Sequence, residues 1–415
     1  MVTDQSIAIE APERITATVA LPASKSISNR ALIVNALSTS PCSLQNLSTS
    51  DDTATLKNAL SHPEATSVNI GAAGTAMRFL TAFFATRQGH TVTLDGSERM
   101  RQRPIAPLVD ALRFLGADIS YCDKEGFPPL RISGRRLSPR HLHIDGSLSS
   151  QFTSAILMIA PIIGDMRISI TGKALSLPYI DMTLAIMRQF GITAHSHRLD
   201  IDIAKGNYCH NGDFSVESDW SAASYWFAIS ALCPQSSISL TGLNQTSVQG
   251  DSAILSYLPQ IGLQAAWQAD GTLRLNHNGS TTDFFEADFN GTPDIAQTFI
   301  TMLCLLGIKF RLHGLSNLKI KETDRLAAMV TEMAKIGFTL SADSDTIAWL
   351  GQKCQATQAT PVFDTYKDHR MAMSMAMAAT RFGKVIISEP SVVTKSYPDF
   401  WNDLAKAGFK ITPAT

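Results

Sequence analysis

The segment TEMAKIGFTL (331–340) contains the pattern that decides the fold. An amphipathic run ends in an apolar residue and Gly337, and a strand-like run follows. Glycine just past a helix is the expected left-handed cap, because it adopts positive φ without a steric penalty. The same pattern occurs in DALRFLGADI (110–119), LAIMRQFGITA (184–194), SYLPQIGLQA (256–265) and NDLAKAGFKI (402–411). The sequence therefore predicts a repeated junction between a helix and a strand.

The glycines of these junctions recur at nearly constant intervals. Successive separations are 75, 71, 75 and 71 residues among Gly116, Gly191, Gly262, Gly337 and Gly408. A period of this size leaves room for six units in 415 residues. The first unit would hold DDTATLKNAL (51–60), which lacks the terminal glycine. We therefore expect six related structural units.

Each unit contains more than the marked helix. Further helical runs occur at 151–163 and 222–232, and alternating strand patterns occur in TVTLDG (91–96), RISITG (167–172) and SISLTG (237–242). Each unit therefore reads as strands mixed with about two helices. Three units would make a domain of about 200 residues, which is an ordinary size. We expect an α/β chain of two or three domains.

Composition excludes several classes of protein. The 35 basic residues nearly balance 36 acidic ones, so neither a general basic field for nucleic acid nor an acidic disordered chain is expected. The apolar run at 155–164 is far shorter than the roughly 20 residues that span a bilayer, and the N-terminal sequence does not resemble a signal peptide. We expect a cytoplasmic protein without membrane or nucleic-acid partners.

Metal and disulfide patterns are also missing from the sequence. No C-x-x-C pair and no H-E-x-x-H motif occurs, so we expect no bound metal and no cofactor. We interpret the six cysteines as ordinary thiols in a reducing compartment. They are Cys42, Cys122, Cys209, Cys233, Cys304 and Cys354.

Several predicted helices place cations near their starts. The helix dipole disfavours a cation there, whereas free backbone N–H groups together with a cation suit an anion such as phosphate. The alternative is that each cation extends into water. The cations are Lys25 and Arg30 after Ser24, Arg78 after Gly74, Arg370 and His369 after Asp368, and Lys321 and Arg325 around 319–329.

Spacing along these helices adds detail. Ser26 and Arg30 are four residues apart and share a helical face, and the same spacing places Lys321 with Arg325 while Glu322 faces elsewhere. Other cations lie in glycine- and proline-rich loops: Arg99, Arg101 and Arg103 in GSERMRQRPIAP, and Lys395 in VVTKSYPDF. In a nearly neutral chain, this clustering predicts a local positive site for a small polyanion.

The ordered series of motifs resembles the 5-enolpyruvylshikimate-3-phosphate (EPSP) synthase family of aromatic amino-acid biosynthesis, over nearly the whole chain. The segments are LPASKSISNRAL (21–32), GTAMR (74–78), ERMRQRPIAPLVDAL (98–112), DGSLSSQFTSA (145–155), PYIDMTL (178–184), VESDWSAASY (216–225), NGTPDIAQT (290–298), KIKETDRLAAM (319–329), DTYKDHRMAM (364–373) and VVTKSYPDFWNDL (392–404).

The resemblance implies a two-domain inside-out α/β barrel. Each domain would hold three βαβαββ-like units, with helices inside and sheets outside. The domain on the shikimate-3-phosphate side would comprise residues 22–216, and the other would comprise 1–21 with 217–415. Two crossover strands, near Pro22 and Glu217, would form the hinge. We expect a monomer.

The resemblance also implies an activity. The enolpyruvyl (carboxyvinyl) group of phosphoenolpyruvate would move to the 5-hydroxyl of shikimate-3-phosphate by addition and elimination, with release of phosphate, toward chorismate. Implied phosphoenolpyruvate-binding residues are Lys25, Gly74, Arg103, Gln151, Arg325, Arg370 and Lys395. Implied shikimate-3-phosphate-binding residues are Lys25, Ser26, Arg30, Ser149, Ser150, Gln151, Ser176, Tyr179, Asp294, Asn317 and Lys321.

Proton transfer needs an acid and a base. The candidates are Asp294 and Glu322, while Lys25 could be an acid or an electrostatic clamp. The simpler alternatives are that Asp294 caps a helix in T-P-D-I-A and that Glu322 is a first-turn acid beside Lys321. His369 either hydrogen-bonds near the site or only starts its helix.

The chain departs from the usual family motif G-N-A-G-T-A-M-R-P at Ala72 and Phe79, both expected beside the phosphoenolpyruvate subsite. The nearest rival activity is the sister transferase that uses UDP-N-acetylglucosamine. That enzyme carries a cysteine in the loop that reads SERMRQRP here, and Cys122 lies past the following helix. A second rival is a non-catalytic anion-binding scaffold built on the same repeats.

Overall fold

The computed structural model describes residues 6–147 and 149–414, which form two compact units. Ala23–Glu217 make one unit, called here the middle unit. Residues 6–22 and 218–414 make the other, called here the terminal unit. The chain passes between units after Pro22 and after Glu217, one residue beyond the domain limits that we expected.

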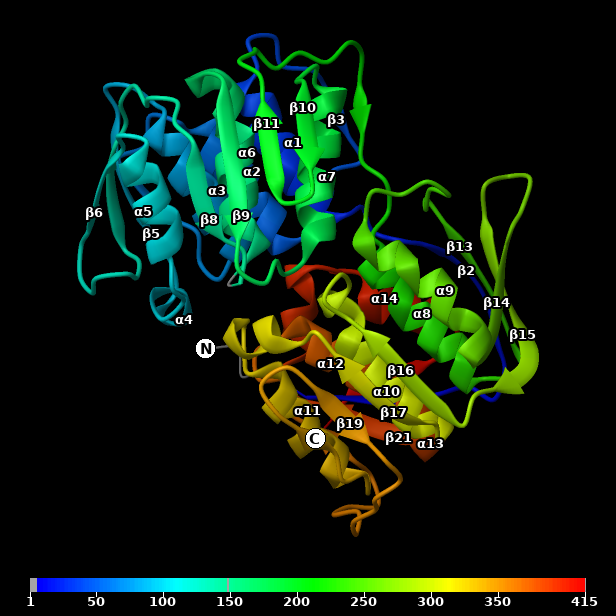
Figure 1. Cartoon of the computed structure of the whole chain (residues 1–415). Coiled ribbons are helices and arrows are strands. Elements are labelled where there is room, and N and C mark those ends of the chain that lie inside the picture. Colours follow the sequence, from blue (N-terminus) through cyan, green and yellow to red (C-terminus); the bar gives the residue numbers. More distant parts are fainter. Residues whose placement is uncertain (1–5, 148, 415) are drawn as a thin grey trace. The chain divides into compact units, whose positions relative to one another are not determined.

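Among the described residues, five four-stranded sheets share one topology. Two parallel strands pair first, and an antiparallel hairpin then adds beside the second strand. The middle unit holds β4(Ser67–Asn69)-β5(Thr91–Asp95)-β7(Leu130–Ser133)-β6(Asp118–Tyr121) and β8(Leu142–Asp145)-β9(Met166–Thr171)-β11(Asp200–Ile203)-β10(Ala194–His197) (Figure 1).

The terminal unit holds the other three of these sheets. They are β2(Ile15–Ala20)-β13(Ser236–Thr241)-β15(Leu273–Thr281)-β14(Ile261–Trp267), β16(Phe284–Asp288)-β17(Lys309–His313)-β19(Ile347–Trp349)-β18(Ser341–Ala342) and β20(Val362–Phe363)-β21(Lys384–Ile387)-β1(Ile7–Glu10)-β22(Lys410–Pro413). In the last sheet the N-terminal strand β1 takes the place of the final hairpin strand.

The remaining repeat, which contains residues 51–60, has fewer strands than the other five. Its two parallel strands are β12 (Phe214–Ser215) and β3 (Leu44–Gln45), and α2 (Asp51–Ser61) follows β3. In the described part of the chain, no hairpin follows α2 in this sheet. A repeat without the hairpin needs no glycine to turn the chain into it, which explains why 51–60 lacks that signal.

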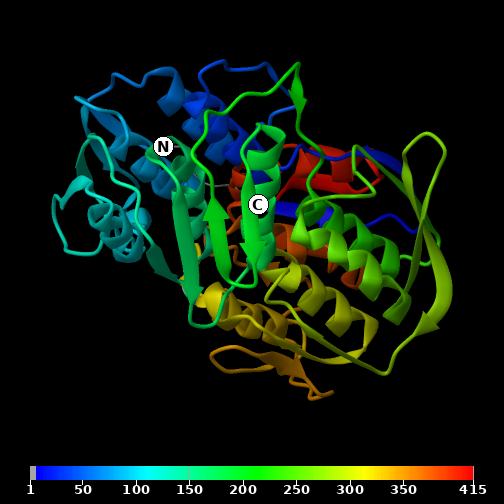
Figure 2. The ribbon, with the colours of Figure 1, turned by 45° about the horizontal axis from the view of Figure 1, so that its top comes forward.

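The first helix of each repeat lies inside its unit. The middle unit buries α1 (Lys25–Leu37), α3 (Gly74–Ala85) and α6 (Ser150–Ile163), and the terminal unit buries α8 (Trp220–Leu232), α10 (Ala296–Leu306) and α12 (His369–Ala376). Eleven of the twelve residues of α3 are buried. A helix buried on nearly all sides belongs to a core. Strands such as β9 and β11 lie on the outside (Figure 2).

The second helices carry the repeated glycines. Gly116, Gly191, Gly337 and Gly408 have φ of 101°, 82°, 93° and 100°. They follow α5 (Ala106–Phe114), α7 (Leu177–Gln189), α11 (Arg325–Lys335) and α14 (Phe400–Lys406). Four helix ends are therefore confirmed as left-handed glycine turns.

The remaining marked glycine, Gly262, does not end an amphipathic helix, so that prediction for residues 256–265 was wrong. Gly262 has φ 80° but lies in β14. Before it stand the 3-10 turn η1 (Gly250–Ala253), the four-residue α9 (Ile254–Tyr257) and the 3-10 turn η2 (Leu258–Gln260). Pro259 explains the difference, because proline lacks the N–H that a continuing helix needs.

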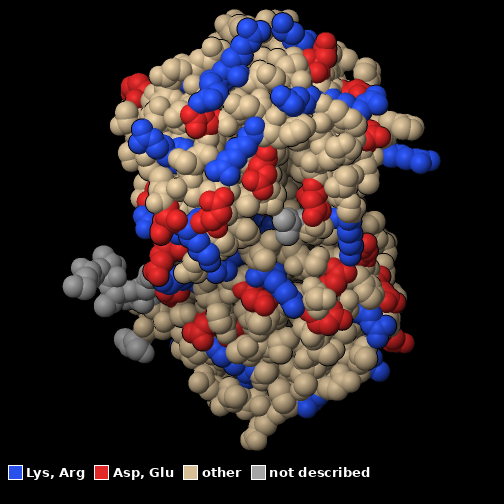
Figure 3. Space-filling view, turned by 60° about the vertical axis from the view of Figure 1, so that its left-hand side comes forward, with Lys and Arg blue, Asp and Glu red and all other residues tan. Residues whose placement is uncertain are grey.

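The remaining short elements connect these parts. They are α4 (Glu98–Arg101), α13 (Ala379–Phe382) and the 3-10 turns η1 (Gly250–Ala253), η3 (Pro293–Ile295), η4 (Ser316–Ile320) and η5 (Pro390–Lys395). Within 6–147 and 149–414, no helix is long and apolar enough to cross a membrane. Figure 3 shows acidic and basic side chains interspersed on one face, as the near-zero net charge suggests.

Candidate active site

In the middle unit, predicted site residues begin the three inner helices. Lys25 is the first residue of α1, Gly74 of α3 and Ser150 of α6. The side chain of Ser149 caps α6 by accepting from the Gln151 amide. The Gln151 side chain donates to Thr75 Oγ1 at 3.3 Å, which joins the first turns of α6 and α3. Helix starts held together in this way present free N–H groups suited to an anion.

Gly74 allows a guanidinium to approach the start of α3. A Cβ atom built on Gly74 would lie 2.6 Å from Nη1 of Arg103, and the Arg103 side chain is largely buried. Because glycine has no side chain, the Arg103 cation can lie directly beside the N-terminal turn of α3. A helix start and a loop arginine thus lie side by side in the middle unit.

Arg78 was expected to bind an anion as a cation near the start of α3, but its guanidinium bonds to the backbone. It is 3% exposed, and its guanidinium donates to the carbonyls of Gly74 at 3.3 Å and Pro104 at 3.1 Å. These bonds tie the α3 start to the loop that carries Arg103. The interpretation of Arg78 as an anion-binding cation was wrong, because its donors hold the backbone together.

Arg30 joins three helices inside the middle unit. Its guanidinium donates to Thr183 Oγ1 at 2.7 Å, Ser154 Oγ at 3.2 Å and the carbonyl of Tyr179 at 3.2 Å. It also donates to the Ser26 carbonyl at 3.0 Å, so the expected shared face of these two residues is confirmed. Burial lowers the pKa of Arg30 to about 10, which still leaves a cation at neutral pH.

Phe79 lies against the same arginine. Its ring centroid is 5.4 Å from the Arg30 guanidinium carbon, within the range of a cation–π contact. This departure from the family motif therefore touches a residue that we assigned to shikimate-3-phosphate. Ser176, another residue of that set, is the N-cap of α7 and has a left-handed backbone with φ 57°.

Lys25 faces an acid of the next helix. Its ammonium lies 3.3 Å from Asp52 Oδ2 in the first turn of α2, and the Lys25 side chain is 16% exposed. Asp52 suits its helix start through the dipole. The pair holds a partly exposed cation at the start of α1.

In the terminal unit, Arg325 is the centre of a cluster of acids. Its guanidinium contacts Asp368 at 2.7 Å, Glu322 at 3.0 Å and Asp294 at 3.4 Å. Burial acts to lower the pKa of Arg325, but the facing carboxylates outweigh it and raise that pKa above its ordinary value. The chain thus places one fully buried cation among three carboxylates.

Two expectations about this segment were wrong. The helix α11 begins only at Arg325, with Asp324 as its cap, so Lys321 lies before the helix and shares no face with Arg325. Glu322 was expected to face away from Arg325, but its carboxylate accepts a hydrogen bond from that guanidinium. It also lies before α11 and not in its first turn. The acidic cap Asp324 competes for the helix start and moves it past the expected position.

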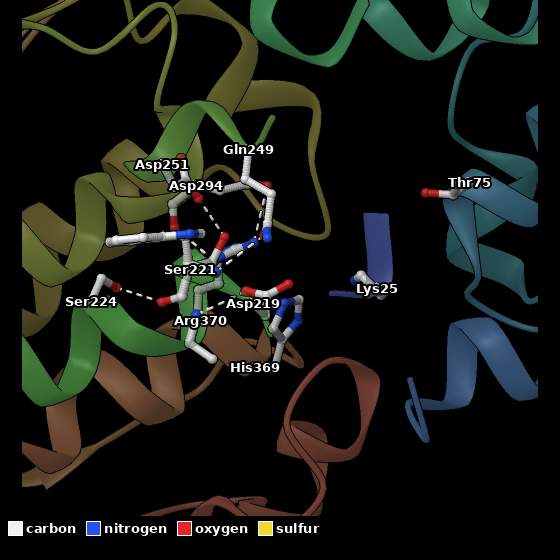
Figure 4. Close-up of polar contacts among 12 residues, drawn as sticks. Lys25, Thr75, Asp219, Ser221, Ser224, Gln249, Asp251, Asp294, His369 and Arg370 are labelled. Carbon is white, nitrogen blue, oxygen red and sulfur yellow. Dashed lines mark hydrogen bonds and ion pairs between the residues drawn. The ribbon is translucent and has the colours of Figure 1, made fainter. Parts of the chain in front are cut away.

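Asp294 and Arg370 form the second contact of this cluster. Their side chains lie 3.0 Å apart, and Arg370 also donates to the Asp294 carbonyl at 2.7 Å (Figure 4). Asp294 sits inside η3, after the N-cap Thr292, so the alternative that it caps a helix was wrong. Asp368 caps α12 by accepting from the Arg370 amide, and buried His369 is the first residue of that helix.

The remaining predicted residues of this unit lie in 3-10 turns or beside them. Lys395 ends η5 and donates to the Lys367 carbonyl at 2.9 Å. Asn317 is buried within η4, and Lys321 directly follows that turn.

Asp251 is an acid of this unit that sequence reasoning missed. It is 4% exposed and accepts a hydrogen bond from Ser221 at the start of α8. Next to it, Gln249 accepts from the Trp220 amide at 3.1 Å and donates to the Ser218 carbonyl at 2.8 Å. Asp251 lies in a four-residue turn with no flanking cation or helix signal, so nothing in the sequence marked it.

Comparison with known proteins shows which family this chain resembles. The protein-family model of EPSP synthase (3-phosphoshikimate 1-carboxyvinyltransferase) matches residues 9–62 and 54–404. The chain belongs to the EPSP synthase family. It is similar to a 3-phosphoshikimate 1-carboxyvinyltransferase of Bacteroides fragilis, with 48% identity over 97% of this chain and 98% of that protein. A relative of the same name from Tolumonas auensis is 38% identical over 96% of this chain and 98% of its own length.

A solved structure of an EPSP synthase from Acinetobacter baumannii has the same fold. The TM-score is 0.79 at 20% identity, with 98% of this chain and 100% of that chain covered. The expected inside-out α/β architecture of the EPSP synthase family, with repeated units, inner helices and outer sheets, is therefore confirmed for this chain.

Proposed function

We propose that this chain transfers the enolpyruvyl group of phosphoenolpyruvate to the 5-hydroxyl of shikimate-3-phosphate. Family membership and near full-length relatives named for this reaction support the proposal. The observation that carries it is the placement of cations and acids at helix starts and in the loops and turns beside them. The Gly74–Arg103 contact and the Asp294–Arg370–Arg325 cluster are the best examples.

The proposed binding roles follow those residues. For phosphoenolpyruvate we propose Lys25, Gly74, Arg103 and Gln151 from the middle unit and Arg325, Arg370 and Lys395 from the terminal unit. For shikimate-3-phosphate we propose Lys25, Ser26, Arg30, Ser149, Ser150, Gln151, Ser176 and Tyr179 from the middle unit and Asp294, Asn317 and Lys321 from the terminal unit. Arg325 would act mainly by holding the acids, since its donors face three carboxylates.

The reaction would proceed in two balanced steps. In the addition, the hydroxyl oxygen bonds to C2 of phosphoenolpyruvate, the methylene carbon takes a proton and the hydroxyl loses one. In the elimination, the bond from C2 to the phosphate oxygen breaks and the methyl group returns a proton. Inorganic phosphate leaves and the double bond re-forms. No redox change occurs, and these steps need only acid, base and charge stabilisation.

We assign the hydroxyl proton to Asp294. Two guanidinium groups hold its carboxylate, which favours the charged form that accepts a proton. Glu322 contacts Arg325 and is 19% exposed, and it and Lys25 are the candidates for delivering the proton to the methylene. The group that delivers this proton must be protonated at the working pH.

Phosphate release with two acceptors tests the proposal. Purified protein should release phosphate from phosphoenolpyruvate when shikimate-3-phosphate is present and not when UDP-N-acetylglucosamine replaces it. Binding of both substrates without phosphate release would support a scaffold instead. We also propose that the protein is a monomer, because all assigned residues come from one chain. A cytoplasmic location is proposed because the family is biosynthetic. Sedimentation of the active protein would test the monomer.

A further inference from the structure

Asp251 is a buried acid whose charge interacts with that of the proposed base, Asp294. It lies in η1, and Ser221 of α8 donates to its Oδ2 atom. Figure 4 shows Asp251 on the same side of Ser221 as Asp294, next to the side chain of Gln249. These residues all belong to the terminal unit: Ser221 lies at the start of α8, Gln249 and Asp251 lie at η1 of the same repeat, and Asp294 lies in η3 before α10 of the next repeat.

One carboxyl oxygen of Asp251 has no hydrogen-bond donor in the described part of the chain, which fits a protonated carboxyl group. Its Oδ1 atom has no hydrogen-bond partner among the described residues, and the residue is 4% exposed. A buried carboxylate is stabilised by several donors or by a paired cation, and an unsatisfied charged oxygen is costly. A neutral carboxyl group avoids most of that cost.

The charged groups around Asp251 favour the same state. Asp294 faces it from η3 and Asp219 from the N-cap of α8, while Arg370 of α12 provides the opposing positive charge and Tyr257 of α9 also faces it. Burial, and then repulsion from Asp294, raise the pKa of Asp251 to about 7, against the Ser221 hydrogen bond and the charge of Arg370.

We propose that Asp251 is a positioning residue that stays protonated beside Asp294. One carboxylate fewer then opposes the positive charge of Arg370, and more of its positive potential is available to bind an anionic substrate. This rests on the proposed function, in which that anion is phosphoenolpyruvate. When Asp251 ionises, a second buried negative charge joins Asp294. The positive potential at Arg370 then falls, and binding of phosphoenolpyruvate weakens.

The protonation state can be tested without any substrate. The infrared carbonyl band of protonated carboxylic acids would be followed in wild type and in Asp251→Asn between about pH 5 and about pH 9. Wild type should show a band, absent from the variant, that disappears near neutral pH. Ser221→Ala should move this transition to higher pH and Asp294→Asn to lower pH, because the first removes a donor to the carboxylate and the second removes a repelling charge. If no such band distinguishes wild type from Asp251→Asn, the proposal is overturned.

Kinetics then test the consequence. KM for phosphoenolpyruvate in wild type should rise above neutral pH relative to Asp251→Asn, by roughly three- to tenfold, while the two agree at lower pH. Both proteins meet the same ionic forms of phosphoenolpyruvate, so the ratio of their KM values reports the enzyme alone. Asp283→Asn, an exposed acid of the same unit, is the matched control and should follow wild type.

The outcomes separate this inference from the proposed function. Parallel KM curves for wild type and Asp251→Asn, in an enzyme that turns over, would overturn the role of Asp251 and leave the reaction intact. A wild-type protein that releases no phosphate would overturn the reaction, while the infrared titration would still report the state of Asp251. If Asp251→Asn does not fold, Ser221→Ala must shift the KM profile to higher pH, and an unshifted profile would count against the proposal.

Discussion

Arg325 donates to the carboxylate of Asp368 at 2.7 Å, and both side chains are almost completely buried. Asp368 also accepts from the Arg370 amide and so caps α12. One carboxylate therefore ties the start of α11 to the start of α12. This contact fixes Arg370 where it meets Asp294, and it makes the stability of the terminal unit inseparable from the geometry of the proposed site.

Arg325→Ala should destabilise the protein strongly. It leaves the fully buried Asp368 without its guanidinium, and breaking a buried ion pair in this way costs about 3–5 kcal/mol. Urea unfolding measures the loss. Arg311→Ala is the control, because Arg311 meets Glu286 only at 4.0 Å on the surface, and it should cost less than about 1 kcal/mol. Equal costs for the two variants would contradict this account of Arg325.

Arg370→Ala should lower turnover by more than about tenfold while the protein stays folded. The substitution removes the cation that faces Asp294 and, in our proposal, phosphoenolpyruvate. Steady-state phosphate release gives the rate, and circular dichroism checks the fold. The exposed Arg381, on the short helix α13, supplies the control Arg381→Ala, which should retain normal rates. Normal kcat/KM in Arg370→Ala would remove it from the site.

Lys25→Met should also reduce turnover by more than about tenfold. Methionine keeps most of the length of the side chain but removes the charge that faces Asp52 at the start of α1. The same phosphate assay applies. Lys57→Met, on the exposed side of α2, removes a charge nearby without touching this contact, and it should be close to wild type. A Lys25→Met enzyme as active as its control would be the contrary result.

Gly74→Ala should raise KM for phosphoenolpyruvate by roughly tenfold and change stability little. The new methyl group would collide with Nη1 of Arg103, and a flexible arginine side chain can move away. The double variant with Arg103→Ala tests the mechanism. If the methyl group acts through Arg103, the two effects on KM will not add. Full additivity would show that Gly74 acts in another way.

Asp251→Asn should change how stability depends on pH. The pKa of Asp251 is raised on folding, so its contribution to stability is complete below the unfolded-state pKa and is lost as pH rises through about 7. Wild type should therefore lose stability relative to Asp251→Asn between about pH 4 and about pH 7, by at most about 4 kcal/mol. Urea unfolding at several pH values measures this. A constant difference across that range would contradict it.

Much of the fold was predictable from the sequence because its signals are local. A glycine after a helix needs only its own backbone conformation, and four of the five marked glycines end helices as expected. The fifth was misjudged because Pro259 and a short 3-10 turn replace the helix. The exchange of β1 into the sheet of β21 and β22 has no local signal, since it pairs opposite ends of the chain.

The site was less predictable because burial and pairing decide its chemistry. Helix starts marked Lys25, Gly74 and Arg370, and the structure places each of them beside a charged side chain. The same rule gave Arg78 the wrong role, because only the structure shows its donors turned to backbone carbonyls. Asp251 was missed for a related reason: its environment is built by residues far away in the sequence.

The most direct test of the central claim is mass analysis of the product formed from phosphoenolpyruvate and shikimate-3-phosphate in deuterated water. Addition and elimination should give an acceptor that keeps its own phosphate, gains a carboxyvinyl group and carries deuterium in the methylene of that group, because the methylene passes through a methyl group. A product without the carboxyvinyl group, or a carboxyvinyl group free of deuterium after many turnovers, would contradict the account.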